Sequence, residues 1–327
     1  MRIFYFALMT YNQEDLVEET LESFKYQIQN YGEDCSFNLI VVDDASIDNT
    51  VQVIKKWINY NSNLFNNVIW QLNNVNCGVV KNYQFIIDKI PDKCHFKLLA
   101  GDDVLSSNNI FSSYKSLDSN TIKTHVKLML KSGIVYYNQI QLMDFYDHYI
   151  TNRSHKYNLK WMRRGCYLHT PSTIYEKITY NLARCSEMNR HFRLFEDDPS
   201  WYSMIKNIPE LKIDFLSTPI VLYRISDRAI SNGNGITNLE FTEELKKLTK
   251  IYYHEEKGLW RLYYWFRIHQ DLPKIMKINL YVDKLRKIYL FVKYANNKKF
   301  KAFKRKIDDA VIKEQKYYNV FIKKKGE

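Results

Sequence analysis

The sequence predicts an α/β protein in which a mostly parallel sheet is flanked by helices and followed by a basic helical extension. Strand and helix signals alternate over residues 1–104, with short loops between them. Such alternation is typical of a parallel sheet connected by right-handed crossovers. From about Leu239 to its end the chain instead carries apolar residues three and four positions apart, which indicates helices.

The elements of the first part can be assigned in order from apolar runs, helical spacing and capping residues. Asn12 is a reasonable N-cap for the first helix and Asp48 for the second. We expect strand 3–9, a helix after Asn12, strand 37–42, a helix after Asp48, strand 67–72, helix 79–90 and strand 96–100.

The pattern is looser in the second part. We predict a helix within 108–131, a tyrosine-rich strand within 133–144, irregular chain over 145–170, a helix near 201–206 and a strand at 220–224. The glycine-containing polar loop Ser231–Gly235 indicates a boundary. The expected domains are 1–238, made of the halves 1–110 and 111–238, and a helical region at 239–327.

Charge and cysteine content narrow the class of protein. The net charge is +12, and residues 251–327 hold 20 Lys and Arg against 8 Asp and Glu, so the excess lies in the tail. The 5 cysteines form no CxxC pair, which favours a reducing compartment over disulfides or a zinc ribbon. The apolar segment 2–9 is expected to be the first strand and not a signal peptide. No apolar run approaches the ~18 residues of a spanning helix, so we expect a cytoplasmic protein.

Acidic residues follow three of the predicted strands or loops. Gly101-Asp102-Asp103 ends one buried strand, Asp43-Asp44 ends another, and Glu196-Asp197-Asp198 precedes Pro199. Carboxylates at the carboxyl edge of a sheet suit a divalent cation that also binds phosphate oxygens. The alternatives are a polar turn for the first two groups and a helix-dipole contact for the third. Asp198 before Pro199 is best interpreted as a helix cap, which leaves Asp197 and Glu196 available as a general base.

Four sequence blocks follow one another in the first part of the chain: a strand with Thr10-Tyr11-Asn12, then Val41 to Thr50, then Asn76-Cys77-Gly78 with Lys81 and Asn82, then Gly101-Asp102-Asp103. Together they resemble the nucleotide-binding half of family 2 glycosyltransferases, inverting enzymes of the Rossmann-like GT-A fold. The resemblance is strong over 1–110, thinner over 111–235 and absent from the helical tail. No GxGxxG and no P-loop motif is present, so neither a dinucleotide fold nor a P-loop is supported.

The resemblance implies a role for each matching residue. A nucleotide-sugar would be held by Thr10, Tyr11, Asn12, Asp44, Lys81 and Asp102. Asp103 would bind the Mn²⁺ or Mg²⁺ that bridges the diphosphate, and Asp197, in a pair that resembles the family's Glu-Asp motif with Glu196, would be the catalytic base. The family often has Tyr-Arg-x-His after its last core strand, whereas this chain has Tyr223-Arg224-Ile225-Ser226. The segment His169 to Ser172 resembles an acceptor-side loop and is given no role.

Two interpretations of the basic tail remain open. Its amphipathic helices could lie on anionic lipid, where a lipid-linked acceptor is found, or they could pack on the catalytic domain or on a second subunit. Aromatic residues at helical spacing, such as Phe300, Phe303 and Phe321, are more often core residues, and the clustered charge tips the balance slightly toward the membrane.

The function that follows is a metal-dependent glycosyltransferase of the hexosyltransferase type. Its donor is expected to be a UDP-sugar and its acceptor a hydroxyl of a glycan or lipid-linked glycan at the inner face of the cell membrane. One rival, a nucleotidyltransferase that makes nucleotide-sugars, needs a glycine-rich basic loop after the first strand, and Tyr11-Asn12-Gln13-Glu14 is neither. The other rival, a nucleic-acid-binding protein that uses the tail, fits poorly with a body of no excess charge, so no nucleic acid is expected.

Overall fold

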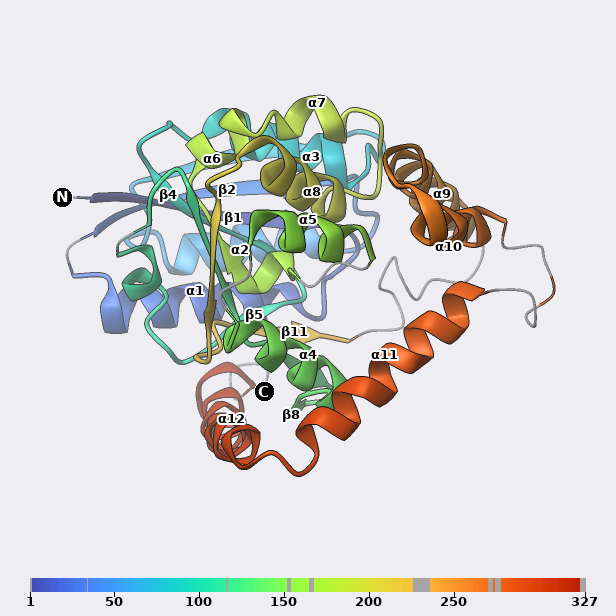
Figure 1. Ribbon diagram of the computed structural model, residues 1–327. Coiled ribbons are helices and arrows are strands. Elements are labelled where there is room, and N and C mark those ends of the chain that lie inside the picture. Colours follow the sequence, from blue (N-terminus) through green and yellow to red (C-terminus); the bar gives the residue numbers. More distant parts are fainter. Residues whose placement is uncertain are drawn as a thin grey trace.

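The computed structural model describes most of the chain (Figure 1). The predicted boundary loop Ser231–Gly235, and with it Cys166, Ser226 and Ile275, lie outside the described residues. The residues that the structure describes are 2–33, 35–115, 117–151, 154–164, 168–225, 236–269, 273 and 278–323.

A four-stranded parallel sheet lies at the centre of the N-terminal half. Its strand order is β3-β2-β1-β4, so β1 pairs with strands on both of its sides. The register sets Thr10 of β1 opposite Asp43 of β2, and Met9 opposite Ala100 of β4. The predicted strands are therefore confirmed in place and direction. Their bounds are Arg2–Thr10 for β1, Cys35–Asp43 for β2, Asn67–Leu72 for β3 and His95–Ala100 for β4.

Helices cover both faces of this sheet because successive side chains of a strand point to opposite faces. Phe6 and Leu8 of β1 pack in one core with the first two helices, whereas Tyr5 and Ala7 pack in another with the third. This arrangement confirms the predicted parallel sheet flanked by helices. The helices are α1 (Val17–Tyr31) and α2 (Thr50–Tyr60) on one face and α3 (Val79–Lys89) on the other.

The prediction of a helix within 108–131 is wrong. A short 3₁₀ turn is followed by two strands, and every residue of the first strand, Thr121–His125, is buried. Three of its five residues, Thr121, Ile122 and Thr124, are β-branched, and the segment is stable as an inner strand, where its backbone pairs on both sides. The elements are η1 (Phe111–Tyr114), β6 (Thr121–His125) and β7 (Leu128–Lys131).

The strands β6 and β7 belong to two different smaller sheets. One has the order β10-β6-β9 and the other β5-β11-β7-β8. The strand predicted at 220–224 is confirmed as β11. The bounds are Val104–Leu105 for β5, Ile134–Tyr136 for β8, Thr173–Ile174 for β9, Lys212–Leu216 for β10 and Val221–Arg224 for β11.

Two further helices lie where a strand and irregular chain were predicted. The tyrosine-rich strand ends early at Tyr136, and helix α4 (Gln139–Tyr149) follows it. The side chain of Asn138 caps α4, with its Oδ1 3.0 Å from the Ile140 nitrogen, a local signal that the sequence prediction overlooked. The remaining helices of this part are α5 (His155–Arg164), η2 (Thr170–Ser172), α6 (Lys177–Leu182), α7 (Cys185–Asn189) and α8 (Asp197–Asn207).

The predicted helix caps have mixed outcomes. Asp48 accepts a hydrogen bond from the Thr50 nitrogen at the start of α2, at 3.0 Å. Asn12 does not cap α1, which begins at Val17. Its φ of 52° turns the chain so that its Oδ1 accepts from the Ile47 nitrogen instead. Asp198 is no cap either, because α8 already begins at Asp197.

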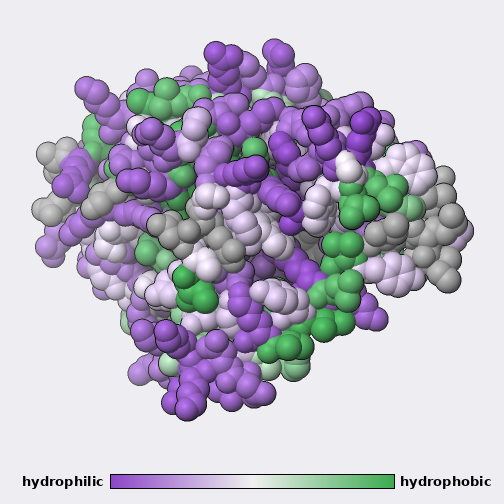
Figure 2. Space-filling view, viewed as in Figure 1, coloured by the Kyte–Doolittle hydropathy of each residue, from purple (hydrophilic) through white to green (hydrophobic). Residues whose placement is uncertain are grey.

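The helical tail is confirmed, and α12 packs on the body of the protein. Phe300, Phe303 and Ile307 are buried among Leu128 and Leu130 of β7. Apolar side chains also gather on the surface over α10 and α11 (Figure 2). Within the described residues, no helix is both long and apolar enough to span a bilayer. The tail consists of α9 (Ile236–Glu255), α10 (Gly258–Ile268), α11 (Ile278–Tyr294), α12 (Lys298–Tyr317) and a terminal π-helical turn (Tyr318–Ile322).

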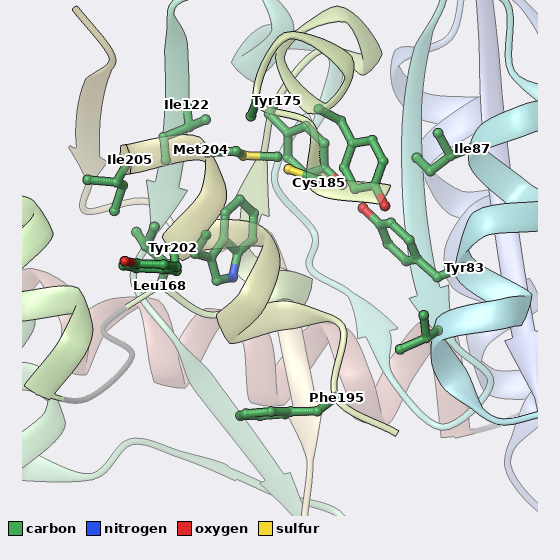
Figure 3. Close-up of a cluster of buried hydrophobic side chains, with 14 of the residues drawn as sticks. Tyr83, Ile87, Ile122, Leu168, Tyr175, Cys185, Phe195, Tyr202, Met204 and Ile205 are labelled. Atoms are coloured by element: carbon green, nitrogen blue, oxygen red, sulfur yellow. The ribbon is translucent and has the colours of Figure 1, made fainter. Parts of the chain in front are cut away.

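The core that β1 shares with α3 also surrounds α8 (Figure 3). Tyr202, Met204 and Ile205 of this helix belong to one buried cluster with Ile122 of β6 and with Tyr175. Each of the three is at most 1% exposed. Because α8 is held by packing along its length, the acidic residues at its N-terminus have a fixed position relative to the sheets.

We predict that Phe300→Ala lowers the free energy of unfolding by about 3 to 5 kcal/mol, because it leaves a cavity beside Tyr146 of α4 and Tyr294 of α11. Phe321→Ala, at a side chain that is 51% exposed, is the matched control and should cost far less. Urea unfolding of both variants measures the difference. Equal effects would contradict the assignment of α12 to the core.

Candidate active site

The carboxyl edge of the central sheet gathers residues from three strand ends. The Thr10 hydroxyl donates to Asp43 Oδ2 at 2.9 Å, and the Asp44 nitrogen donates to the Thr10 carbonyl at 2.9 Å. The Gly101 nitrogen donates to the Met9 carbonyl at 2.9 Å. The ladder around β1 thus continues into the loops and joins the ends of β2 and β4 to that of β1.

A cavity of about 360 Å³ opens at this edge. Thr10, Tyr11 and Asp44, three of the predicted nucleotide-binding residues, line it. Tyr11 is 48% exposed, so its ring is available to a planar ligand. The other lining residues are Met9, Gln13, Asn76, Gly78, Val79, Asn82, Ala100, Arg193 and Leu194.

Three predicted nucleotide-binding residues are not among those that line this cavity, namely Asn12, Lys81 and Asp102 of the turn after β4. Lys81 is exposed on α3, although its neighbour Asn82 lines the cavity. Asn12 bridges to the turn after β2: its nitrogen donates to the Ser46 hydroxyl at 2.8 Å. Sequence spacing identified the right segments, but the backbone turn at Asn12 and the orientation of α3 decide which side chains face the cavity.

Asp44 shapes the cavity by holding the loop after β3. Its Oδ1 accepts from the Cys77 nitrogen at 2.7 Å, and its Oδ2 accepts from the Gly78 nitrogen at 2.9 Å. Gly78 has a φ of +85°, and a Cβ there would lie 2.4 Å from Arg193 Cγ. Only glycine fits at this position, where the loop passes close to Arg193.

The turn after β4 is fixed by Arg224 of β11. The Arg224 nitrogen donates to Asp103 Oδ1 at 2.9 Å, and its Nε donates to the Asp102 carbonyl at 2.7 Å. The guanidinium also forms an ion pair with Glu19. Asp103 is 1% exposed, and its Oδ2 is buried without a hydrogen-bond partner. An ionised oxygen in that position is stabilised by a cation.

Burial raises the pKa of both carboxyls in this turn. For Asp103 burial is the largest cause and the neighbouring charge of Asp102 the second, which places its pKa well above the usual range. The pKa of Asp102 is raised by burial, against the opposing effect of Arg224. The chain therefore offers two adjacent carboxylates whose charge is costly without a cation.

These residues fit a divalent cation that is shared with a ligand. No cluster of three or more His, Cys, Asp or Glu suited to a metal occurs among the residues that the structure describes. A Mg²⁺ or Mn²⁺ site made of one or two carboxylates and substrate phosphates needs no such cluster. The buried, unpartnered Oδ2 of Asp103 is the atom that such an ion would use.

The second acidic pair lies at the N-terminus of α8. Burial, followed by the charge of Asp197, raises the pKa of Glu196 to about 8. The pKa of Asp197 is also raised by burial, while the positive charge of Lys127 acts to lower it. The Asp198 nitrogen donates to Asp197 Oδ1 at 2.7 Å, which orients that carboxylate.

Tyr223 and Lys127 connect the two acidic groups. The phenol of Tyr223 has a raised pKa, first through burial and then through the charges of Asp103, Asp102, Asp197 and Glu196. Lys127 Nζ lies 4.3 Å from the centre of the Tyr223 ring. Lys127 also lines one cavity with Asp197, and Tyr223 precedes Arg224, whose nitrogen binds Asp103.

Lys127 was missed by sequence reasoning. It follows β6 in a segment that was predicted to be helical, and no motif marks it. If the segment before Lys127 had been assigned as a strand, its place just after a buried strand would have marked it as a candidate site residue, as for the acidic groups after β2 and β4.

A second cavity, of about 240 Å³, adjoins Asp197. His125 contributes to it and is 3% exposed. The His125 Nδ1 lies 2.7 Å from the Thr218 carbonyl, to which it donates, and Nε2 is buried without a partner. Burial lowers the His125 pKa to about 4, so the ring is neutral and Nε2 is an acceptor. The lining residues are Thr124, His125, Lys127, Gln141, Asp144, Phe145, Leu168, His169 and Asp197.

Helices of the tail hold both acidic segments in place. Glu244 of α9 accepts from the Leu194 nitrogen at 2.9 Å, just before Glu196. Glu314 of α12 is fully buried, and it accepts from the Ser107 nitrogen at 2.8 Å and from the Ser107 hydroxyl at 2.7 Å. The tail is thus part of the framework of the site.

Comparison with protein families agrees with this geometry. Residues 6–108 match the family model described as glycosyl transferase family 2. The match confirms the family resemblance over the segment that contains the central sheet and the Gly101-Asp102-Asp103 turn. No curated protein matches the chain.

Solved structures extend the likeness beyond the family 2 segment. Residues 1–349 of S. aureus TarS, solved in complex with UDP-GlcNAc, are similar with a TM-score of 0.53 and 17% identity, over 76% of this chain and 66% of that one. This confirms the predicted GT-A fold class. The mannosyltransferase PcManGT from Pyrobaculum calidifontis, in complex with GDP-Man and Mn²⁺, matches at a TM-score of 0.49 and 11% identity, over 98% of this chain and 87% of that one. The second likeness is too weak to bear on the site.

A buried lysine beneath the site predicts a pH-dependent stability. Burial lowers the pKa of Lys97 to about 7, although the charge of Asp103 opposes this. Between about pH 7 and its ordinary pKa, the unfolded chain binds a proton at Lys97 that the folded chain lacks, so stability rises with pH. Urea unfolding should show wild type gaining stability relative to Lys97→Met from about pH 7 to about pH 9. Parallel pH profiles would contradict this.

Proposed function

We propose that this protein is an inverting glycosyltransferase of the hexosyltransferase type that moves a sugar from a nucleotide-sugar to an acceptor hydroxyl. The observation that carries the proposal is the arrangement of two acidic groups beside a cavity lined by Thr10 and Asp44. Asp103 is bound by the nitrogen of Arg224, next to Tyr223, and Lys127 lies against the Tyr223 ring and lines one cavity with Asp197. The turn after β4, with Asp103, suits a metal ion bound to a diphosphate, and the start of α8, with Asp197, suits a general base. In the proposed organisation, residues 1–238 form the catalytic domain, with halves 1–110 and 111–238, and residues 239–327 support it.

The donor is proposed to be a UDP-sugar. Its base and ribose would occupy the 360 Å³ cavity, against the exposed ring of Tyr11 and near Thr10 and Asp44. Asp44 would act in part through the loop of Cys77 and Gly78 that it holds. Asp102 would face the ribose and the sugar, Asn12 would maintain the turn beside Tyr11, and Lys81 would approach the diphosphate from α3.

Asp103, together with Asp102, would hold the Mn²⁺ or Mg²⁺. When bound, this ion supplies positive charge that stabilises the departing nucleoside diphosphate. Arg224 fixes Asp103 Oδ1 through its nitrogen and leaves Oδ2 for the ion. Lys127 adds a fixed positive charge on the side of the reacting sugar. The chain's own residues thereby position the leaving group and exclude water from the buried turn.

Asp197 is proposed to be the general base. An acceptor hydroxyl in the 240 Å³ cavity would donate its proton to Asp197, and its oxygen would attack the anomeric carbon from the face opposite the diphosphate. The bond to the diphosphate breaks as the new glycosidic bond forms, and a single displacement inverts the centre. Glu196, whose pKa of about 8 keeps it largely protonated at neutral pH, is the less suitable base.

The acceptor is proposed to be a glycan or lipid-linked glycan. Neutral His125 Nε2, Gln141 and the Phe145 ring are suited to a sugar, with hydroxyl groups to be bonded and an apolar ring face to be covered. The protein is inferred to act in the cytoplasm, at the inner face of the cell membrane.

Asp197→Asn tests the base. The variant should bind the nucleotide-sugar as wild type does but should transfer about a hundredfold to ten-thousandfold more slowly, because the proton acceptor is lost. Calorimetry with a UDP-sugar measures binding, and release of UDP with a mixture of glycan acceptors measures transfer. Glu196→Gln is the matched control. A dead Glu196→Gln enzyme with an active Asp197→Asn enzyme would reverse the assignment.

Asp103→Asn tests the metal site. Calorimetry of UDP in the presence of Mn²⁺ should show the metal-dependent part of the affinity abolished, because Oδ2 no longer carries charge. Asp308→Asn, on the surface of α12, is the control and should bind as wild type does. Unchanged metal dependence in Asp103→Asn would remove this residue from the site.

A further inference from the structure

An exposed apolar ridge runs along α11. Tyr281, Leu285, Ile288 and Val292 follow one another at intervals of four, three and four residues, which places them on a single face of the helix. Their exposed fractions are 49%, 63%, 49% and 75%. We call these four side chains the apolar ridge. The opposite face of α11 is anchored, because Leu290 and Tyr294 are buried in the core that also contains Phe300.

The surface around the ridge extends its apolar character. Tyr289 and Phe291 flank it and are 56% and 52% exposed. On α10, Leu259 is 84% exposed. Figure 2 shows a band of hydrophobic surface over the region of α10 and α11, and Figure 1 shows α11 at the periphery of the molecule. A continuous patch of this kind marks an interaction surface.

The charges around the ridge indicate its partner. Lys284 and Lys287 are exposed on α11 beside it, and Lys293 lies on its other side. The single acidic residue of α11, Asp283, is engaged by the Tyr263 hydroxyl at 2.9 Å. An apolar face bordered by lysines is complementary to acyl chains beneath anionic headgroups. A second copy would instead bring the same lysines against one another across a two-fold axis.

We propose that the apolar ridge and Leu259 insert into the headgroup region of an anionic membrane leaflet, with Lys284 and Lys287 on the lipid phosphates. The membrane-binding face is therefore α11 with the start of α10, and not α12, whose aromatic residues Phe300 and Phe303 are core residues. The interpretations of the tail as membrane-bound and as packed on the body thus apply to different helices.

The position of the ridge also has a consequence for the acceptor, which rests on the proposed glycosyl transfer. Arg286 of α11 donates to Asp144 Oδ1 at 2.5 Å, and Asp144 lines the cavity beside Asp197. Because Arg286 is on the body side of α11, a membrane at the ridge would be separated from this cavity by the ~10 Å diameter of one helix. An acceptor carried on a lipid could then reach Asp197 without leaving the bilayer.

Vesicle flotation tests the membrane face. Wild type should float with phosphatidylcholine vesicles that contain phosphatidylglycerol and much less with phosphatidylcholine alone. The triple variant Leu285→Gln, Ile288→Gln, Val292→Gln should lose about tenfold or more of this binding, because it removes three inserted apolar side chains. The matched control replaces three exposed aliphatic residues elsewhere, Ile134, Leu182 and Ile312, by glutamine and should float as wild type does.

A charge variant gives an independent readout. Lys284→Gln with Lys287→Gln should weaken flotation with the anionic vesicles by about fivefold or more and leave binding to phosphatidylcholine unchanged. Equal flotation of wild type and the triple variant overturns the proposal. A second result would also overturn it: wild type sediments as a dimer, the triple variant sediments as a monomer, and neither protein floats. The ridge would then be a contact between two copies of the chain.

Calorimetry with UDP separates this inference from the proposed function. The triple variant should bind UDP as wild type does, since the ridge does not line the donor cavity. Flotation without UDP binding in wild type would leave the membrane face standing and refute the donor assignment. UDP binding and sugar transfer by a wild-type protein that does not float would support the donor assignment and refute the membrane face.

Discussion

The site depends on the pairing of β1 with strands on both of its sides. Because β2 and β4 run parallel to β1 in a fixed register, Thr10, Asp43 and Ala100 end at the same edge of the sheet. A slip of one residue in either ladder would turn Thr10 or the following loop away from the cavity. The burial of Phe6, Ala7 and Leu8 between two layers of helices holds that register.

Contacts between distant segments then bring together two acidic groups at this edge of the sheet, one in the turn after β4 and one at the start of α8. The nitrogen of Arg224 binds Asp103, and the charges of both centres meet at Tyr223, the residue before it. The strand β11 thus performs two tasks, since its backbone fixes the turn after β4 and its neighbouring side chain faces α8. Glu244 and Glu314, from the helical tail, hold the loops on either side.

The helical tail both supports the candidate active site and exposes an apolar surface to solvent. Its α12 is buried where it meets β8 and Tyr146 of α4, whereas α11 has one face in the core and another in solvent. Its positive charge is therefore carried by helices whose inner faces are fixed to the body. A tail of this kind presents an apolar face at a set orientation, which a flexible basic extension would not do.

The sequence by itself determined the parallel sheet, the order of its strands along the chain and the family resemblance, because these follow from local apolar patterns and from short blocks near strand ends. It also pointed to Thr10, Tyr11 and Asp44, which line the cavity. The tertiary structure alone decided the strands β6 and β7, the position of Lys127 beside Tyr223 and the helix that exposes its apolar face. A periodic pattern is the same whether its apolar side meets a neighbouring strand or solvent, and only packing distinguishes the two.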